Sequence, residues 1–185
     1  MYTIKKTAGY SFVEVLVAIA ILLVSIVGPL TIASTGLRNA LFAREQNIAF
    51  FLAQEGLEAI IFLRENAGIK NIDNGTDTWD WVSDIPAACR KGAPCRVHLN
   101  NVSPSTRLTE CDPISRCDLY LHPSGVYRYR HQVGGEETPF NRQVFLTEIG
   151  TNALRVRSVV TWHATAFGEA REVELETYLY DIYEN

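Results

Sequence analysis

Hydrophobic and polar positions divide the chain into three stretches, of which the first is the most distinctive. Residues 15–37 contain no charged side chain, and residues 12–33 are nearly all aliphatic. As one helix, this stretch would extend over roughly 34 Å, enough to cross the hydrocarbon core of a bilayer. A chain of 185 residues is too small to bury such a helix on all sides. The pattern therefore predicts a membrane-spanning helix rather than a buried core helix.

The second stretch, residues 38–66, has hydrophobic residues at helical spacing. One face carries Phe42, Ala49, Ala53, Gly56, Ile60 and Leu63, and the adjacent face carries Ile48, Leu52, Ala59 and Phe62. This predicts an amphipathic continuation of the helix that packs on a sheet. A coiled-coil partner is the alternative, but the period departs from strict heptads. Asn66, Ala67 and Gly68 predict the C-terminal end of the helix.

The third stretch, residues 69–185, has the two-residue period of β-strands after an initial loop at 69–94. Strands are predicted at 126–132 and 142–149, separated by a turn-rich segment with Gly134, Gly135, Thr138 and Pro139. The clearest hairpin pairs residues 154–163 with 172–179: one face is apolar, and the other places arginines opposite glutamates. We expect an α+β fold, in which the long helix packs on an antiparallel sheet.

Charge sets the expected orientation in the membrane. Lys5 and Lys6 precede the apolar stretch, and no acidic residue comes before Glu14. By the positive-inside rule, the N-terminus stays in the cytoplasm and the chain after about Arg38 is exported. The net charge of −4 and the pI near 5.6 argue against a nucleic-acid surface, which would need a basic excess.

The order of segments at the N-terminus differs from that of an ordinary secretory signal. Small residues at positions 7–9 come before the apolar stretch, so cleavage there would leave the hydrophobic segment attached. The sequence GYSFVE at residues 9–14, followed by VLVAIAILLVSIVGPL, resembles the leader of type IV prepilins and type II secretion pseudopilins. The resemblance covers Lys5 to about Pro29, and the run GYSFVEVLVAIAIL is more similar to minor subunits than to major pilins.

The resemblance implies a processing step and a set of partners. A prepilin peptidase would remove residues 1–9 by cutting between Gly9 and Tyr10, and Tyr10 would carry the methylated amine. Residues 10–37 would then form the membrane and filament-core helix, residues 38–66 its amphipathic continuation, and residues 69–185 the exported β domain. The expected partners are membrane lipid before assembly, the inner-membrane assembly machinery and other pilin or pseudopilin subunits. The expected location is the cytoplasmic (inner) membrane, then a filament in the periplasm or at the cell surface.

Two residues of the apolar helix are candidates for a role in assembly. Glu14 places a carboxylate near the edge of a spanning helix, where an unpaired charge is costly. The resemblance implies that it neutralises the N-terminal amine of a neighbouring subunit; the alternative is a side chain that only extends to the interface. Pro29, directly after Gly28, predicts a kink or a locally unwound segment, with or without a function in packing.

Four cysteines lie in the part predicted to be exported, where disulfides persist. The segments Cys89-RKGAP-Cys95 and Cys111-DPISR-Cys117 share one spacing, which favours two local disulfides. Pairing of 89 with 117 and of 95 with 111 is the second possibility. A zinc site with His98 and His122 is a third, although zinc ligands usually lie two to four residues apart.

The sequence predicts no catalytic residue, metal ligand or cofactor. It contains no Gly-rich phosphate loop, no HExxH and no GxSxG motif. We therefore expect a structural subunit of a type IV pilus-like or type II secretion filament and not an enzyme. The alternative is a single-pass membrane-anchored binding or sensor domain without a filament role, which would not require Gly9 or Glu14.

Overall fold

A computed structural model of the 185-residue chain shows two compact units, Met1–Leu41 and Phe42–Asn185. The structure describes residues 9, 11–74, 81–82, 84–99, 107–111, 117–123, 128–164 and 168–181, except for the side chains of residues 68 and 70–74. Lys5, Lys6 and Tyr10 therefore lie outside the described residues, and so does most of the predicted leader. Residues 126 and 127 of the first predicted strand also lie outside them.

A single long helix, α1 (Phe12–Asn74), begins in the first unit and ends in the second. The prediction that it ends at Asn66–Gly68 is wrong, because the helix continues for two more turns. A glycine that stops a helix usually adopts a left-handed conformation. Gly68 instead keeps a helical backbone, and Ala67 just before it is buried. Glycine inside a helix costs about 1 kcal/mol relative to alanine, which the packing of this turn offsets.

Within the second unit, α1 buries the face that the sequence predicts. Ala49, Ala53, Ile60 and Leu63 are fully buried, and Gly56 is buried with them. Of the adjacent face, Leu52 and Ala59 are buried and Ile48 is half-buried, but Phe62 is 44% exposed. Phe62 was therefore assigned wrongly; the guanidinium of Arg107 lies over its ring at 4.6 Å.

The remaining elements are a short helix and seven strands within the described residues. They are α2 (Ala87–Arg90), β1 (Cys95–Val97), β2 (Leu108–Glu110), β3 (Asp118–Leu121), β4 (Tyr129–Arg130), β5 (Glu136–Ile149), β6 (Ala153–His163) and β7 (Ala170–Tyr180). The strands form one antiparallel sheet in which β5 is central. Strand β5 pairs with β1 and β3 along one side and with β6 along the other, and β7 follows β6.

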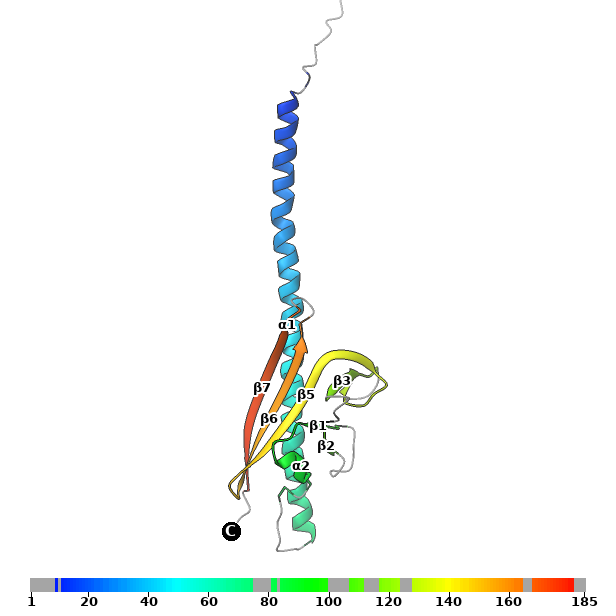
Figure 1. The fold of residues 1–185 in the computed structure, drawn as a ribbon, viewed down its shortest axis with the longest axis vertical. Helices are drawn as coiled ribbons and strands as arrows, with labels where there is room; N and C mark the ends of the chain where they lie inside the picture. The colour runs from blue at the N-terminus through cyan, green and yellow to red at the C-terminus, as the bar shows by residue number, and fades with distance from the viewer. Residues whose placement is uncertain are drawn as a thin grey trace, which may run out of the picture. The chain divides into compact units, whose positions relative to one another are not determined.

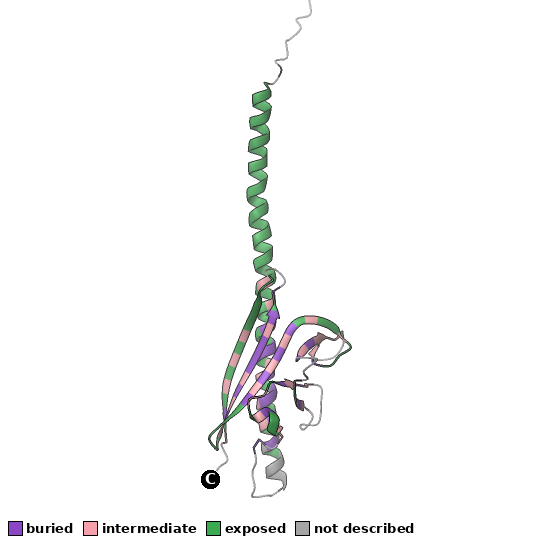
Figure 2. Cartoon of the chain, viewed as in Figure 1, coloured by how far each residue is buried: buried purple, intermediate pink, exposed green. Residues whose placement is uncertain are grey.

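The three long strands β5, β6 and β7 lie across the part of α1 that belongs to the second unit, and each is antiparallel to its neighbour in the sheet (Figure 1). The predicted hairpin forms between β6 and β7, with Leu154 opposite Leu179 and Val160 opposite Val173. Strand β6 alternates buried and half-buried residues along most of its length. The alternation therefore gives the sheet one apolar face, which packs on the helix (Figure 2).

The predicted charge pairs form on the outer face of this hairpin, mostly between diagonal neighbours. Arg157 lies opposite Glu176 in the register, but its guanidinium contacts Glu174 at 3.2 Å. Arg155 contacts Glu176 at 3.5 Å. Such partly exposed pairs contribute about 0.2–1 kcal/mol each, so they support the hairpin without determining it.

Strand β5 begins six positions earlier than its predicted start at Arg142, so the prediction of a turn at Thr138-Pro139 is wrong. Proline lacks a backbone N–H and is tolerated in strands at bulges and edges. Pro139 occupies such a place: the register between β3 and β5 shifts between Asp118 and Tyr120, opposite this part of β5. The ladder with β6 extends only as far as Phe140.

Helix and sheet approach each other most closely at Gly56. A Cβ atom at this position would overlap Ser158 Oγ on β6 and lie 3.3 Å from a methyl group of Val144 on β5. Only glycine therefore permits this spacing between α1 and the sheet. The fold is α+β with a pilin-like architecture: a long N-terminal apolar helix and a curled antiparallel sheet.

Candidate processing and assembly segment

The first unit consists of Gly9, Ser11 and the start of α1 among its described residues. The backbone N–H of Val15 donates to the carbonyl of Ser11 at 3.2 Å, so Ser11 precedes the first helical turn. Glu14 lies in that turn and is exposed. A carboxylate at this position interacts favourably with the positive end of the helix dipole. It also remains open to a cationic partner from outside the chain.

The side chains of α1 in this unit are exposed without exception. Every residue from 11 to 41 is exposed (Figure 2), including large aliphatic residues such as Leu22, Leu23 and Val24 at 58%, 59% and 75%. Among the described residues, α1 is the one helix long and apolar enough to cross a membrane, and none of its apolar window is buried. The helix is therefore not the core of the chain, and its surface requires lipid or other protein as surroundings.

Helix α1 continues through Gly28 and Pro29 without interruption, so the locally unwound segment expected there is absent. Proline removes one helical hydrogen bond and strains the preceding turn, but the flanking turns remain helical. The hydroxyl groups nearby are bonded within the helix. Thr31 Oγ1 donates to the carbonyl of Val27 at 2.9 Å, and Ser25 Oγ donates to that of Leu22 at 2.8 Å. These polar side chains therefore enter an apolar environment without unsatisfied donors.

The four cysteines form the two local disulfides that the sequence favours. Cys89 in α2 is bonded to Cys95 at the start of β1, and Cys111 after β2 is bonded to Cys117 before β3. None of the four is a free thiol. Disulfides in short loops stabilise a fold by restricting the unfolded chain. Here they join α2 to the start of β1, and the end of β2 to the start of β3.

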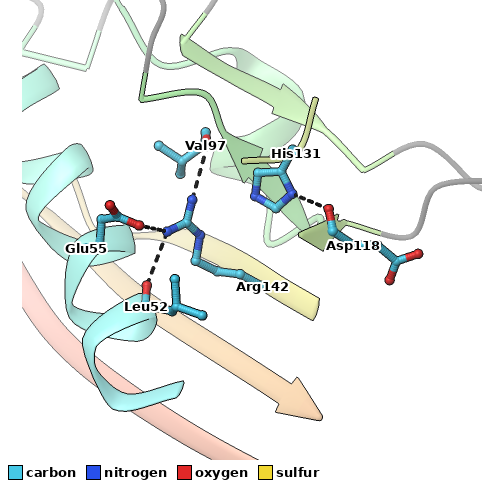
Figure 3. Close-up of polar contacts among 6 residues, drawn as sticks. All are labelled: Leu52, Glu55, Val97, Asp118, His131 and Arg142. Atoms are coloured by element: carbon cyan, nitrogen blue, oxygen red, sulfur yellow. Dashed lines mark hydrogen bonds and ion pairs between the residues drawn. The ribbon is translucent and has the colours of Figure 1, made fainter. Parts of the chain in front are cut away.

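A buried arginine on β5 forms a polar network in the second unit (Figure 3). Arg142 is fully buried, and its Nη1 donates to Glu55 Oε2 on α1 at 2.6 Å and to the carbonyl of Leu52 at 3.3 Å. Its Nη2 donates to the carbonyl of Val97 at 3.4 Å. Complete burial lowers the pKa of this guanidinium, and the carboxylate of Glu55 opposes that effect. The side chain thus joins α1, β1 and β5.

A buried histidine lies beside this arginine (Figure 3). His131 is 4% exposed, and its Nδ1 donates to the carbonyl of Asp118 at 3.1 Å. Burial, together with the positive charge of Arg142, lowers the pKa of His131 to about 2. Burial also lowers the pKa of His98, whose ring lies 6.1 Å from that of His131. Both rings are therefore neutral at physiological pH, and their part in the network is structural.

The residues predicted as sites do not converge on one place. Gly9, Glu14 and Pro29 lie in the first unit, whereas the cysteines lie in the second. The sequence analysis missed Arg142, Glu55 and His131. A signal for Arg142 existed, because the two-residue period places it on the same face as Phe140, Val144 and Leu146. An arginine on the apolar face of a strand indicates a buried polar contact.

Comparison with protein families finds the prokaryotic N-terminal methylation motif at residues 4–28. No curated protein and no solved structure matches the chain. The motif contains the predicted cleavage position at Gly9 and also Glu14, and it ends within the apolar part of α1. The chain therefore carries a type IV pilin-like prepilin segment at its N-terminus, joined to an α+β fold of pilin-like architecture.

Proposed function

We propose that the chain is a structural subunit, of the minor pilin or pseudopilin kind, in a type IV pilus-like or type II secretion filament. In this proposal a prepilin peptidase removes residues 1–9, and Tyr10 becomes the methylated N-terminus. The inner-membrane assembly machinery then transfers the subunit from lipid into the filament. The second unit acts outside the cytoplasm as a structural or recognition module, and it has no enzymatic role.

The observation that carries this proposal is the position of the methylation motif. Residues 4–28 match it, and directly within and after it α1 exposes its whole apolar surface as far as Leu41. An ordinary signal peptide loses its hydrophobic segment with the leader. Cleavage at the start of this motif retains the segment. A retained, exposed apolar helix has lipid as its surroundings first and neighbouring helices after assembly.

In this proposal, Glu14 determines how neighbouring subunits align in the filament. Its carboxylate lies in the first turn of α1, five residues after the cleavage position at Gly9. A charge gains nothing from lipid and must lose its water to enter a helix bundle. It is stabilised there only by an opposite charge, and the processed amine of a neighbouring Tyr10 supplies one. We propose that this pair sets how far neighbouring subunits are displaced along the filament.

The proposal is tested by the N-terminus of the protein recovered from its native host. Mass spectrometry of sheared filaments should find a chain that begins at Tyr10 with a methylated amine. Gly9→Leu should block cleavage, leave residues 1–9 attached and remove the protein from the filament fraction. The alternative, a membrane-anchored binding or sensor domain, predicts an intact Met1 terminus and no protein in sheared filaments, and that result would overturn the proposal.

A further inference from the structure

The face of the sheet that is turned away from α1 carries a row of polar side chains across three neighbouring strands. Asp118 on β3 lies opposite Asn141 on β5, which in turn lies opposite Thr161 on β6. Residues directly opposite each other share a face of the sheet, with Cβ atoms about 4.5–5.5 Å apart. Their chain neighbours Phe140 and Trp162 are buried in the core beside α1. Because side chains alternate between the two faces, the polar row lies on the outer face.

The polar row lines a hollow of about 350 Å³ on this face. Gln143 on β5 and His163 on β6 lie two residues further along the same strands, so they are on the same face, and both also line the hollow. This volume lies within the range of small-molecule sites, about 300–1,000 Å³. Thr161 is half-buried and His163 is exposed, so the hollow is open to solvent. Among the described residues, its lining contains no lysine or arginine.

Hydrogen bonds within the lining hold its amide groups in one orientation. Asn141 Nδ2 donates to Asp118 Oδ1 at 2.9 Å, and Gln143 Nε2 donates to Asn141 Oδ1 at 3.1 Å. A carboxylate can only accept, so it determines which way the amide of Asn141 faces. Among the described residues, the hydroxyl of Thr161 and the ring of His163 form no hydrogen bond. The hollow therefore combines groups that are already oriented, which lowers the cost of binding, with groups that can bond a ligand.

We propose that this hollow binds a neutral sugar unit. The hydroxyl groups of a sugar each donate and accept hydrogen bonds. The lining matches them, because Asp118 accepts, whereas the amide of Gln143 and the hydroxyl of Thr161 can do both. The carboxylate of Asp118 repels phosphates and acidic sugars, and no lysine or arginine of the described lining offsets it. A metal ion is a poorer match, since the described residues contain no group of three His, Cys, Asp or Glu side chains that could hold one.

The experiment is saturation-transfer NMR on the full-length chain, in a detergent without a sugar headgroup so that the detergent does not compete. The probes are D-glucose, D-galactose and D-mannose, each at about 10 mM to detect millimolar affinity, and at least one should bind. Thr161→Val should weaken that binding by about fivefold, and Asp118→Asn by at least about tenfold, because bonds to a charged group are stronger. Thr147→Val is the matched control and should have no effect, because Thr147 is an exposed residue of β5 that does not line the hollow.

Urea unfolding of each variant shows whether a loss of binding reflects a loss of structure. If Asp118→Asn unfolds more easily than the wild type, Thr161→Val still tests the site, because valine has the shape of threonine and only the hydroxyl is lost. Three results would overturn the inference: no binding of any of the three sugars, equal affinity of Thr161→Val and the wild type, or tighter binding of D-glucose 6-phosphate than of D-glucose. The inference goes beyond the proposed function, since sugar binding by the purified chain requires neither cleavage nor assembly.

Discussion

The two parts of helix α1 differ in burial: its side chains are exposed in the first unit, and one face is buried by the sheet in the second. Both parts contain the same types of aliphatic residue. In the first unit, Leu23 and Val27 are both 59% exposed, whereas Ile60 and Leu63 in the second unit are fully buried by the sheet. Burying an aliphatic side chain contributes about 1.5–3 kcal/mol. The second unit obtains this contribution within the chain, and the first can obtain it only from lipid or from other protein.

The glycines of α1 show the same contrast. A Cβ atom at Gly28 or Gly36 would meet nothing within 4 Å, whereas one at Gly56 would overlap Ser158 Oγ. Gly56 is therefore required by packing inside the chain. The two glycines of the first unit have no such reason within the chain, so any packing reason for them lies in a partner. Three substitutions in the second unit test whether its buried contacts stabilise it as this comparison implies.

The largest effect is expected for the buried network. Arg142→Ala leaves the carboxylate of Glu55 without its cation and removes the hydrogen bonds to the carbonyls of Leu52 and Val97, so it should destabilise the second unit by about 3–5 kcal/mol. Urea unfolding of the full chain in detergent measures this through tryptophan fluorescence, because Trp81 and Trp162 are buried in that unit. Arg155→Ala, which removes an exposed pair, is the matched control and should cost at most about 1 kcal/mol.

A smaller effect is expected from pH. The pKa of His131 is about 2 in the folded chain and 6.5 ordinarily, so between these values only the unfolded chain binds the proton. Stability should therefore fall as pH drops below 6.5, by up to about 1.4 kcal/mol per pH unit from this group. His131→Phe should be less stable than the wild type at pH 7.5 but should lose less stability by pH 5. An unchanged pH dependence in this variant would contradict the assignment.

The smallest of the three stability effects is expected at Gly56, where α1 and the sheet approach each other most closely. Gly56→Ala should cost about 1–2 kcal/mol, because overpacking against Ser158 exceeds the gain in helix propensity. Adding Ser158→Ala removes the overlapping oxygen and should recover part of that loss. Gly36→Ala should leave the unfolding transition of the second unit unchanged. Equal effects at the two glycines would mean that the contrast between the units is not one of packing.

The spacing of hydrophobic residues predicted those parts of the fold in which one spacing continues along a whole helix or strand. The hairpin of β6 and β7, the buried face of α1 and the α+β class follow from alternation and helical spacing. The prepilin-type segment was predicted from GYSFVE at residues 9–14, and the methylation motif covers it. These signals are local, so tertiary contacts do not alter them.

The parts that the sequence did not predict depend on contacts between distant residues. The helix passes Gly68 because it packs there, and β5 tolerates Pro139 because a bulge in the pairing with β3 lies opposite it. Arg142 is buried because Glu55, 87 residues away in sequence, supplies its counter-charge. Propensity and period describe each residue with its neighbours along the chain, so they cannot show such compensation.

The central claim is that the first unit finds its partners in other subunits. The most direct test is the recovery of Glu14→Ala in sheared filaments relative to the membrane pool, with Glu14→Gln as the variant that keeps shape and loses charge. Both should be cleaved and inserted normally, yet both should be nearly absent from filaments, because the neighbouring amine loses its counter-charge in a low-dielectric core. Recovery of Glu14→Ala equal to that of the wild type would contradict the account and favour an anchored domain.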